Sequence, residues 1–177
     1  MHGIGRKAAL VAGSGVLGLA AALLSPGAAH ATELTCTAPA GPGLVEDVRT
    51  DGDAACGARV DELSRALSRA IDGVAFSRAD LGGTAVSLAH SGGVAAAETE
   101  SGGVGAVSIG AESVSIISAD PGALALAMSL TRGQTFVGTV EEGVRCDAGI
   151  GVAINVTTGQ LCLSDGVNSW ATHLGLP

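Results

Sequence analysis

Between residues 84 and 141 the hydrophobic residues fall into short segments that recur about every ten residues. Within these segments large apolar residues alternate with alanine or serine, as Val107 and Ile109 alternate with Ala106 and Ser108. A period of two is that of a β-strand, so one face of each strand would carry large side chains and the other small ones. The segments are TAVSLAH (84–90), VAAAETE (94–100), GAVSIGA (105–111), SVSIISA (113–119), ALALAMS (123–129) and TFVGTVE (135–141).

Turn sequences separate the segments, and most of them contain glycine. SGG (91–93) and DPG (120–122) are examples; glycine accepts a positive φ, and the Pro-Gly pair sets a tight bend. The pattern predicts an internal β-repeat over residues 80–141. We expect a mainly β, Gly/Ala-rich short-repeat β-solenoid or roll, in which small side chains fill a thin interior and hydrogen bonds join successive turns. The first alternative is a small β-sandwich or barrel. The second alternative is that this glycine-rich region is largely disordered.

The hydrophobic spacing before the repeat is that of a helix. Apolar residues recur every three or four positions, with charged residues on the opposite side. Asp61 and Glu62 would lie in the first turn and Gly73 just after the last, which suits the helix dipole and a C-terminal stop. The pattern predicts one short amphipathic helix over residues 60–74. Its apolar positions are Val60, Leu63, Leu67, Ala70, Ile71 and Val74.

The two ends of the chain after residue 31 have other patterns. Residues 32–59 are rich in proline, glycine and aspartate, which predicts an irregular, disulfide-held segment. Residues 150–156 alternate again, residues 157–160 have turn chemistry, and residues 161–163 return as a strand. This predicts a β-hairpin within a C-terminal hairpin and tail of residues 142–177. In a solenoid such a hairpin would cover the open edge of the last turn.

Residues 1–31 have the layout of a cleaved secretory signal peptide. Arg6 and Lys7 precede an apolar run, and AHA (29–31) supplies the small residues of a cleavage site. The run contains GSGVLG (13–18), which spells a dinucleotide-binding turn, but the flanking strand, helix and acidic residue of that motif are missing. We therefore expect export, one domain over residues 32–177, no cofactor, and no stable membrane insertion after cleavage.

Four cysteines follow the signal peptide, and export makes two disulfides the expected state. Four cysteines allow three pairings, of which closeness in sequence favours Cys36–Cys56 and Cys146–Cys162. Such staples suit the composition, because the sequence has only three aromatic residues and 28 glycines. A zinc site is not expected, since no two cysteines have the C-x-x-C spacing.

The charge of the exported part narrows the choice of partners. Residues 32–177 keep seven arginines and all 17 acidic residues, which is a formal charge of −10. Such a chain neither neutralises phosphates nor attracts anionic lipids, so nucleic acid and anionic membranes are not expected partners. An acidic surface mainly favours solubility.

The polar residues form no pattern that predicts catalysis or metal binding. His90 and Ser91 are adjacent, but neighbours at a strand end point to opposite faces, and no G-x-S-x-G motif follows residue 31. The aspartate cluster lacks the spacing of an EF-hand calcium loop. The glutamate pair could act as acid and base only in a cleft, and the sequence predicts none. These clusters are Asp47, Asp51 and Asp53, and the pair Glu98 and Glu100.

Three stretches carry a resemblance to known families. CTAP (36–39) with DGDAACGA (51–58), the Gly-Gly-punctuated repeats and the hairpin GVAINVTTGQLCL (151–163) resemble a family of small secreted actinobacterial proteins grouped as a domain of unknown function. This resemblance covers most of residues 32–165 and implies export and origin, but no activity. GAVSIGAESVSIISADPGALALAMS (105–129) is similar to the β-roll heads of trimeric autotransporter adhesins, without their strict spacing.

The sequence therefore predicts a non-enzymatic exported protein of the cell envelope or the medium, acting as a structural or interaction module through an extended β-surface. Its partner would be the cell wall or a protein. Trp170, in the tail of a chain with few aromatic residues, would fill the end of the core or anchor a partner. The alternative is a secreted module that binds a small ligand or a protein, such as an inhibitor or carrier, near residues 60–74 or Trp170.

Overall fold

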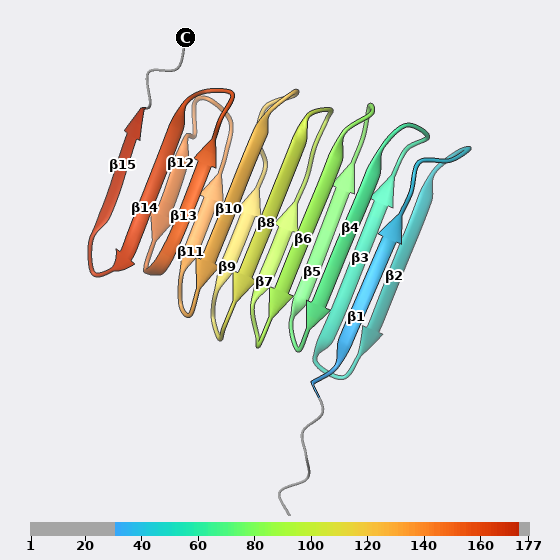
Figure 1. Ribbon diagram of the computed structural model, residues 1–177, viewed down its shortest axis with the longest axis horizontal. Coiled ribbons are helices and arrows are strands. Elements are labelled where there is room, and N and C mark those ends of the chain that lie inside the picture. Colours follow the sequence, from blue (N-terminus) through green and yellow to red (C-terminus); the bar gives the residue numbers. More distant parts are fainter. Residues whose placement is uncertain (1–30, 174–177) are drawn as a thin grey trace, which may run out of the picture. The chain divides into compact units, whose positions relative to one another are not determined.

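The computed structural model describes residues 31–173, and all regular structure in that range is β (Figure 1). The strands form two sheets. Sheet A has the order β1-β4-β6-β8-β10-β13-β14-β15, and sheet B has the order β12-β11-β9-β7-β5-β3-β2. The strands are β1 (Glu33–Ala38), β2 (Val45–Asp51), β3 (Ala54–Val60), β4 (Arg65–Ile71), β5 (Val74–Ala79), β6 (Thr84–His90), β7 (Val94–Ala97), β8 (Gly103–Ile109), β9 (Val114–Ile117), β10 (Leu124–Leu130), β11 (Gln134–Val137), β12 (Val144–Asp147), β13 (Gly149–Asn155), β14 (Gln160–Gly166) and β15 (Ser169–His173).

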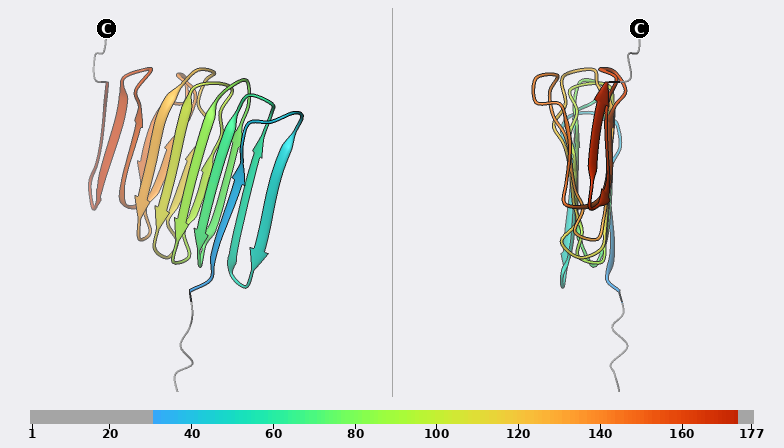
Figure 2. Two further views of the ribbon diagram at one scale, coloured as in Figure 1. Left: turned by 45° about the vertical axis from the view of Figure 1, so that its right-hand side comes forward. Right: turned by 90° about the vertical axis from the view of Figure 1, so that its left-hand side faces the viewer.

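The middle of the molecule is a two-sided β-solenoid, which confirms the favoured prediction. Each turn contributes one strand to each sheet: β4 and β5, then β6 and β7, β8 and β9, β10 and β11. Within each sheet these strands are parallel and in register. Figure 2 shows the two sheets lying back to back as a thin slab. Antiparallel pairs occur only towards the two ends, as β1–β4, β2–β3, β11–β12 and the strands from β13 onward.

Small side chains fill the interior, and large ones point outward. Because the parallel strands are in register, inward positions stack in columns such as Ala66, Ala85, Val104 and Ala125 in sheet A. Most members of the buried hydrophobic core are alanine, and the largest fully buried side chain is Ile117. Two sheets that meet mainly through alanine and serine lie close together, so the interior has room for only a few branched residues, such as Val104 and Ile117.

Serine hydroxyls run through this interior and are satisfied by one another. Ser68 Oγ donates to the Gly57 carbonyl at 2.6 Å and is bonded to the hydroxyls of Ser77 and Ser87 at 2.5 and 2.9 Å. A second chain of bonds joins five further hydroxyls across two turns, and its members are Ser108, Ser113, Ser115, Ser129 and Thr135. A buried hydroxyl without a partner is costly, so these chains fix how one turn stacks on the next.

The turns carry the backbone strain that the sequence predicts. Ser91 and Gly92 both have positive φ, 52° and 82°, as a tight two-residue turn requires. The next residue, Gly93, is needed for space: a Cβ there would lie 2.6 Å from the Ser108 carbonyl oxygen of the following turn. The Gly-Gly sequences therefore serve both the bend and the close stacking.

The predicted helix over residues 60–74 is wrong. This stretch contains the end of β3, all of β4 and the start of β5, and no helix occurs anywhere in residues 31–173. Among the large residues used for the helical pattern, Val60 is buried at the end of β3, but Leu63 is 75% exposed and Leu67 is 40% exposed. The buried residues of β4 are Ala66, Ser68 and Ala70, which have the period of two of a strand. Consequently, no helix in the described range could cross a membrane.

Two other regional predictions have different outcomes. Residues 32–59 are not irregular, because they form β1, β2 and β3. The C-terminal hairpin is confirmed as β13 and β14, which pair from Gly149–Gly166 to Asn155–Gln160. Both expected disulfides form: Cys36–Cys56 joins β1 to β3, and Cys146–Cys162 joins β12 to β14. The predicted signal peptide lies almost wholly outside the described residues.

Candidate functional site

The outer surface of sheet A carries a continuous set of large apolar side chains, which we call the apolar face. It follows from the strand alternation, because β6, β8, β10, β13 and β14 turn mainly small or polar residues inward, with Val104 as an exception, and most of their large apolar residues outward. Its members are Val86, Leu88, Val107, Ile109, Leu124, Leu126, Met128, Leu130, Ile150, Val152, Ile154, Leu161, Leu163 and Trp170.

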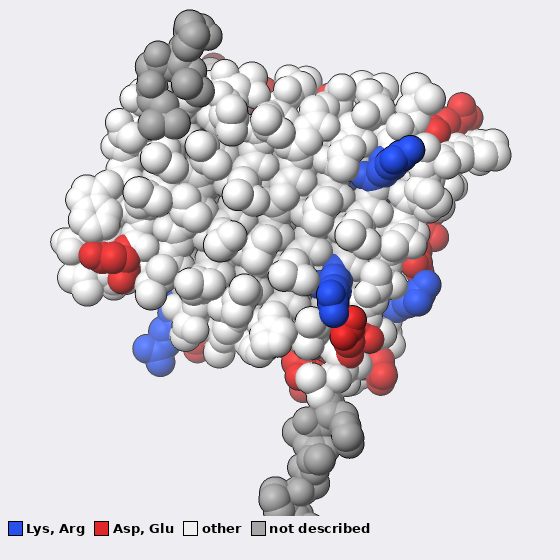
Figure 3. Space-filling view, in the orientation of Figure 1, with Lys and Arg blue, Asp and Glu red and all other residues white. Residues whose placement is uncertain are grey.

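The apolar face is uncharged over its middle. The outward positions of β6, β8, β10 and β13 include no Lys, Arg, Asp or Glu. Figure 3 shows this face, with the charged side chains gathered towards β1 and β4 and along the margins. One of the marginal groups is the ion pair of Arg69 Nη2 with Glu33 Oε1, at 2.7 Å. The middle of the apolar face therefore differs from the rest of this acidic chain in carrying no charged side chains.

Trp170 belongs to this face and does not fill the core. Its side chain is 55% exposed and lies in register with Leu163, which continues the row to Val152 and Met128. Beside this row is a shallow apolar depression of about 250 Å³, lined by Met128, Leu130, Ile150, Val152 and Leu163 among others. Of the two roles considered for Trp170, the exposed position favours contact with a partner.

A second feature is a groove at the C-terminal end of the solenoid. Beyond β10 sheet A adds three strands, whereas beyond β11 sheet B adds only β12. β12 packs mainly against β13 and β14 and less extensively against β15, so β15 extends partly past the last strand of sheet B. The space under β15 and beside β12, which we call the end groove, consists of three adjoining cavities of about 170, 180 and 200 Å³.

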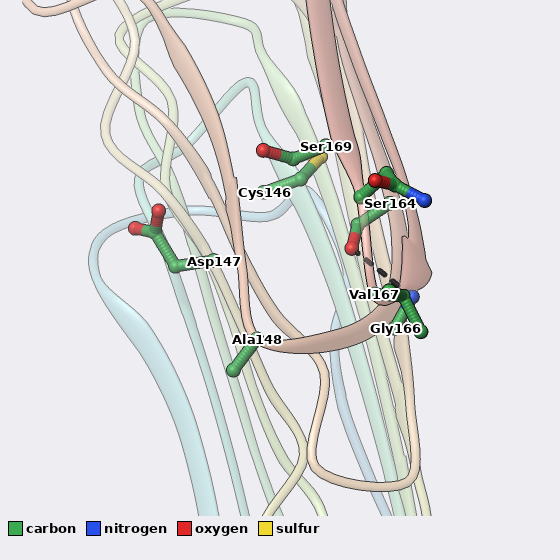
Figure 4. Close-up of a pocket in the computed structure, with 8 residues that line it drawn as sticks. Cys146, Asp147, Ala148, Ser164, Gly166, Val167 and Ser169 are labelled. Carbon is green, nitrogen blue, oxygen red and sulfur yellow. Dashed lines mark hydrogen bonds between the residues drawn. The ribbon is translucent and has the colours of Figure 1, made fainter.

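The end groove is lined mainly by small and polar groups. Figure 4 shows one end of it, where Cys146 of β12 points toward Ser164 and Ser169 of sheet A and the Asp147 carboxylate points away from them. Ser164 Oγ donates to the Gly149 carbonyl at 2.7 Å and so is already satisfied. The middle cavity shares Cys146 and Ser169 with this one and adds Ala171, and the third reaches His173. The groove thus follows β12 along its length.

The opposite end of the solenoid is closed by a carboxylate. Asp47 Oδ2 on β2 accepts a hydrogen bond from the Thr37 N–H on β1 at 3.1 Å, which ties the outermost strands of the two sheets together. Arg49 Nε and Nη2 each lie 3.0 Å from an oxygen of Asp47. The Arg49 hydrogen bond, and then the Thr37 N–H, hold the pKa of Asp47 below its ordinary value.

The polar residues weighed for chemistry do not form a reactive site in residues 31–173. His90 Nδ1 and Ser91 Oγ do meet, at 2.7 Å, contrary to the expectation of opposite faces, because the positive φ of Ser91 takes it out of the strand. No carboxylate of the described range hydrogen-bonds to either group, and both are solvent-accessible. A general base would need an orienting partner.

The acidic residues also have structural partners or lie apart. Glu98 Oε1 pairs with Arg78 Nη1 at 3.0 Å, and Asp47 pairs with Arg49 as described. Within the described range no three His, Cys, Asp or Glu side chains are grouped as metal ligands. Sequence reasoning anticipated the large-out, small-in alternation that builds the apolar face, but it did not anticipate the end groove.

Comparison with known proteins gives one match. Residues 4–165 match the model of a family of unknown function (DUF6764). No curated protein is similar enough to match. No solved structure matches either, so the similarity of residues 105–129 to adhesin heads stays a prediction.

Proposed function

The chain belongs to this family of unknown function, which assigns it no activity, and we propose from its geometry that it is an exported, non-enzymatic structural or interaction module of the cell envelope or the medium. The two disulfides support export, because such bonds persist in oxidising compartments. The layout of residues 1–31 as a cleaved signal peptide supports it independently.

The apolar face carries the interaction part of the proposal. Contiguous exposed apolar patches larger than a few hundred Å² are rare on monomeric soluble proteins and usually mark an interaction site. Here the face runs across six strands and includes an exposed tryptophan on β15, a residue type enriched in interface anchors. Its partner would be a protein or a cell-wall component with a broad apolar surface of its own.

Shape favours this proposal over a small-ligand carrier. Ligand sites are usually cavities of about 300–1,000 Å³ with a few converging polar groups. The depression between Met128 and Leu163 measures about 250 Å³ and is lined almost wholly by apolar side chains. The lack of an oriented nucleophile or metal cluster in residues 31–173 gives no support for catalysis.

A matched pair of substitutions tests the proposal. Leu126 in the apolar face and Ile116 on the outer surface of sheet B are both 39% exposed. We expect Leu126→Glu to lower retention of the protein on isolated envelopes of its own host about tenfold, because a large apolar contact becomes a charge. Ile116→Glu should leave retention unchanged. Co-sedimentation of the oxidised, secreted protein with the envelopes measures both.

Two results would contradict the proposal. One is equal retention of the Leu126→Glu and Ile116→Glu proteins, which would show that the apolar face is not the contact. The other is a wild-type protein that neither sediments with envelopes nor forms a complex in the medium. Hydrolase activity that is lost in His90→Ala would overturn the non-enzymatic part separately.

A further inference from the structure

Two of the three inward residues of β15, Ser169 and Ala171, are as small as the residues of the core, yet β12 leaves them exposed; the third inward residue is His173. Ala171 pairs with the buried Cys162, whose column continues to Ala153 and Ala127 inside the slab. Ser169 likewise pairs with Ser164 of β14. Both residues are nevertheless exposed, because sheet B ends at β12. Side chains of this size suit a strand that lies opposite at the narrow spacing of the rest of the interior.

Both β12 and β15 have an outer edge that no strand of the described range pairs with. In an antiparallel pair, successive residues turn their N–H and C=O groups alternately to one side and the other. The Gly138 N–H donates to the Gly143 carbonyl at 2.9 Å, which sets the alternation along β12. The backbone groups of Arg145 therefore face β11, and the backbone groups of Val144 and Cys146 face outward.

The same reasoning applies to β15. The Asp165 N–H donates to the Asn168 carbonyl at 3.1 Å, so Trp170 and Thr172 bond to β14, and the backbone groups of Ser169, Ala171 and His173 face outward. On both strands, therefore, the residues with unpaired backbone groups are those whose side chains point inward. Two edge strands can pair in one sheet and keep their small side chains facing the interior only when, on both strands, the residues with unpaired backbone groups also have inward side chains.

We propose that the end groove binds a second copy of this chain, with β15 of each copy pairing to β12 of the other. A two-fold axis parallel to the strands exchanges the two sheets and preserves strand direction. The sheet A and sheet B strands of one turn run in opposite directions. β12 reverses the direction of β11, and β13, β14 and β15 each reverse the direction of the strand before them in sheet A. β12 and β15 therefore run in opposite directions in this arrangement. Sheet A of one copy then continues into sheet B of the other, and both open edges are paired at once.

The disulfide fixes the register of this joint. Cys146 is bonded to Cys162, which pairs with Ala171, so the three residues lie at one height along the strands. The two-fold axis keeps heights unchanged and therefore places Cys146 beside the partner's Ala171, and Val144 beside the partner's His173. On the outer surface, Arg145 lies beside the partner's Thr172. Across the axis Ser169 and Ala171 of one copy face the same residues of the other, and the two His173 side chains also face each other.

Size and charge are compatible with a specific but reversible dimer. With strands about 4.8 Å and sheets about 10 Å apart, the joined edges and inner surfaces cover about 1,000 Å² in total, the lower limit for specific interfaces. β15 carries no Asp, Glu, Lys or Arg, and β12 has one charge of each sign, so no like charges meet. We expect a dissociation constant of about 10 μM.

Sedimentation of the oxidised unit Ala31–Pro177, which is compact in itself, tests the proposal. Wild type should pass from monomer to dimer over concentrations around 10 μM. Ala171→Lys places a charge inside the joint and should weaken association about 100-fold. Val48→Lys, on the exposed edge strand β2 at the other end, should associate like wild type. Retained disulfides and β-type circular dichroism show that each variant folds.

A charge pair tests the register independently of folding. Thr172→Glu should tighten the dimer about fivefold through the partner's Arg145, and Thr172→Lys should weaken it by a similar factor. Adding Arg145→Glu to Thr172→Lys should restore wild-type association. In the unsubstituted protein, amide hydrogen exchange at Cys146 and Ala171 should slow as concentration rises, while exchange at Thr35 on β1 should not change.

A monomer at every concentration would overturn the proposal, as would a dimer that Ala171→Lys leaves intact or that Val48→Lys dissociates. A dimer in which the double substitution fails to restore association would overturn the register. The proposal does not rest on the apolar face. Envelope retention lost in Leu126→Glu but kept in Ala171→Lys would separate the two surfaces.

Discussion

The two ends of this solenoid face the same problem and treat it differently. A parallel stack ends in strands with unpaired backbone groups, which invite other chains to pair with them. At the N-terminal end β2 carries four charged residues, and Asp47 reaches across to the Thr37 N–H of β1. At the C-terminal end β15 carries no Asp, Glu, Lys or Arg, and sheet A runs past sheet B. The comparison indicates that one end is protected against association and the other is suited to it.

The disulfides should show the largest effect on either end. They span 20 residues in Cys36–Cys56 and 16 residues in Cys146–Cys162. By loop-closure entropy each should contribute about 3 kcal/mol, so paired Cys→Ala substitutions should lower the free energy of unfolding by similar amounts. Denaturant titration measures this. Limited proteolysis should then reveal earlier cutting near β15 than near β2, because the N-terminal end keeps the 3.1 Å bond between the Thr37 N–H and Asp47, whereas the C-terminal end keeps the longer 3.4 Å bond from Gln160 Nε2 to the Val140 carbonyl. Equal cutting at both ends would contradict the comparison.

Removing the carboxylate tie should have the next largest effect. Asp47→Ala leaves the Thr37 N–H without its partner and should lower the free energy of unfolding by about 1–2 kcal/mol. It should also convert the protected end into an associating one, which light scattering at rising concentration would detect. Asp53→Ala, in the turn after β2, is the control and should change neither quantity. No change in Asp47→Ala would mean that charge alone protects this edge.

Acid should act on the same tie. Because the pKa of Asp47 is lowered in the folded protein, its stabilising effect is complete above the ordinary value of 3.8 and is lost as pH falls through the lower, folded value. The melting temperature should therefore drop below about pH 4. The drop should be smaller in Asp47→Asn, which cannot titrate. An identical acid profile in both proteins would exclude Asp47 as the group responsible.

The smallest effect should be at the turn before β15. Asp165 Oδ1 accepts hydrogen bonds from the N–H groups of Asn168 and Val167 at 2.7 and 2.8 Å, and these lower its pKa. Protonation should loosen this turn at low pH, and Trp170 fluorescence should report it because Trp170 is the only tryptophan. The signal should be absent in Asp165→Asn. Its persistence there would assign the change to another group.

The sequence predicted the strand repeat because the parallel stack is built from local rules: alternation within a strand and glycine at each turn. The helix over residues 60–74 was mistaken because the pattern was taken from the large residues, whereas in this thin slab Ala66, Ser68 and Ala70 form the buried side. The alternation of small inward and large outward residues in the sequence predicted the apolar face. Nothing local foreshadowed the end groove, since it depends on how many strands each sheet adds after its last full turn.

The in-register stacking has a consequence for how long the molecule can be. Equivalent positions of successive turns are about twenty residues apart, as Val74, Val94, Val114 and Gln134 are, and each turn bonds only to the turns beside it. Duplicating or deleting one such unit would preserve both termini and every contact they make. The length of the solenoid can therefore change by whole turns, in evolution or by design, while both ends keep their sequence.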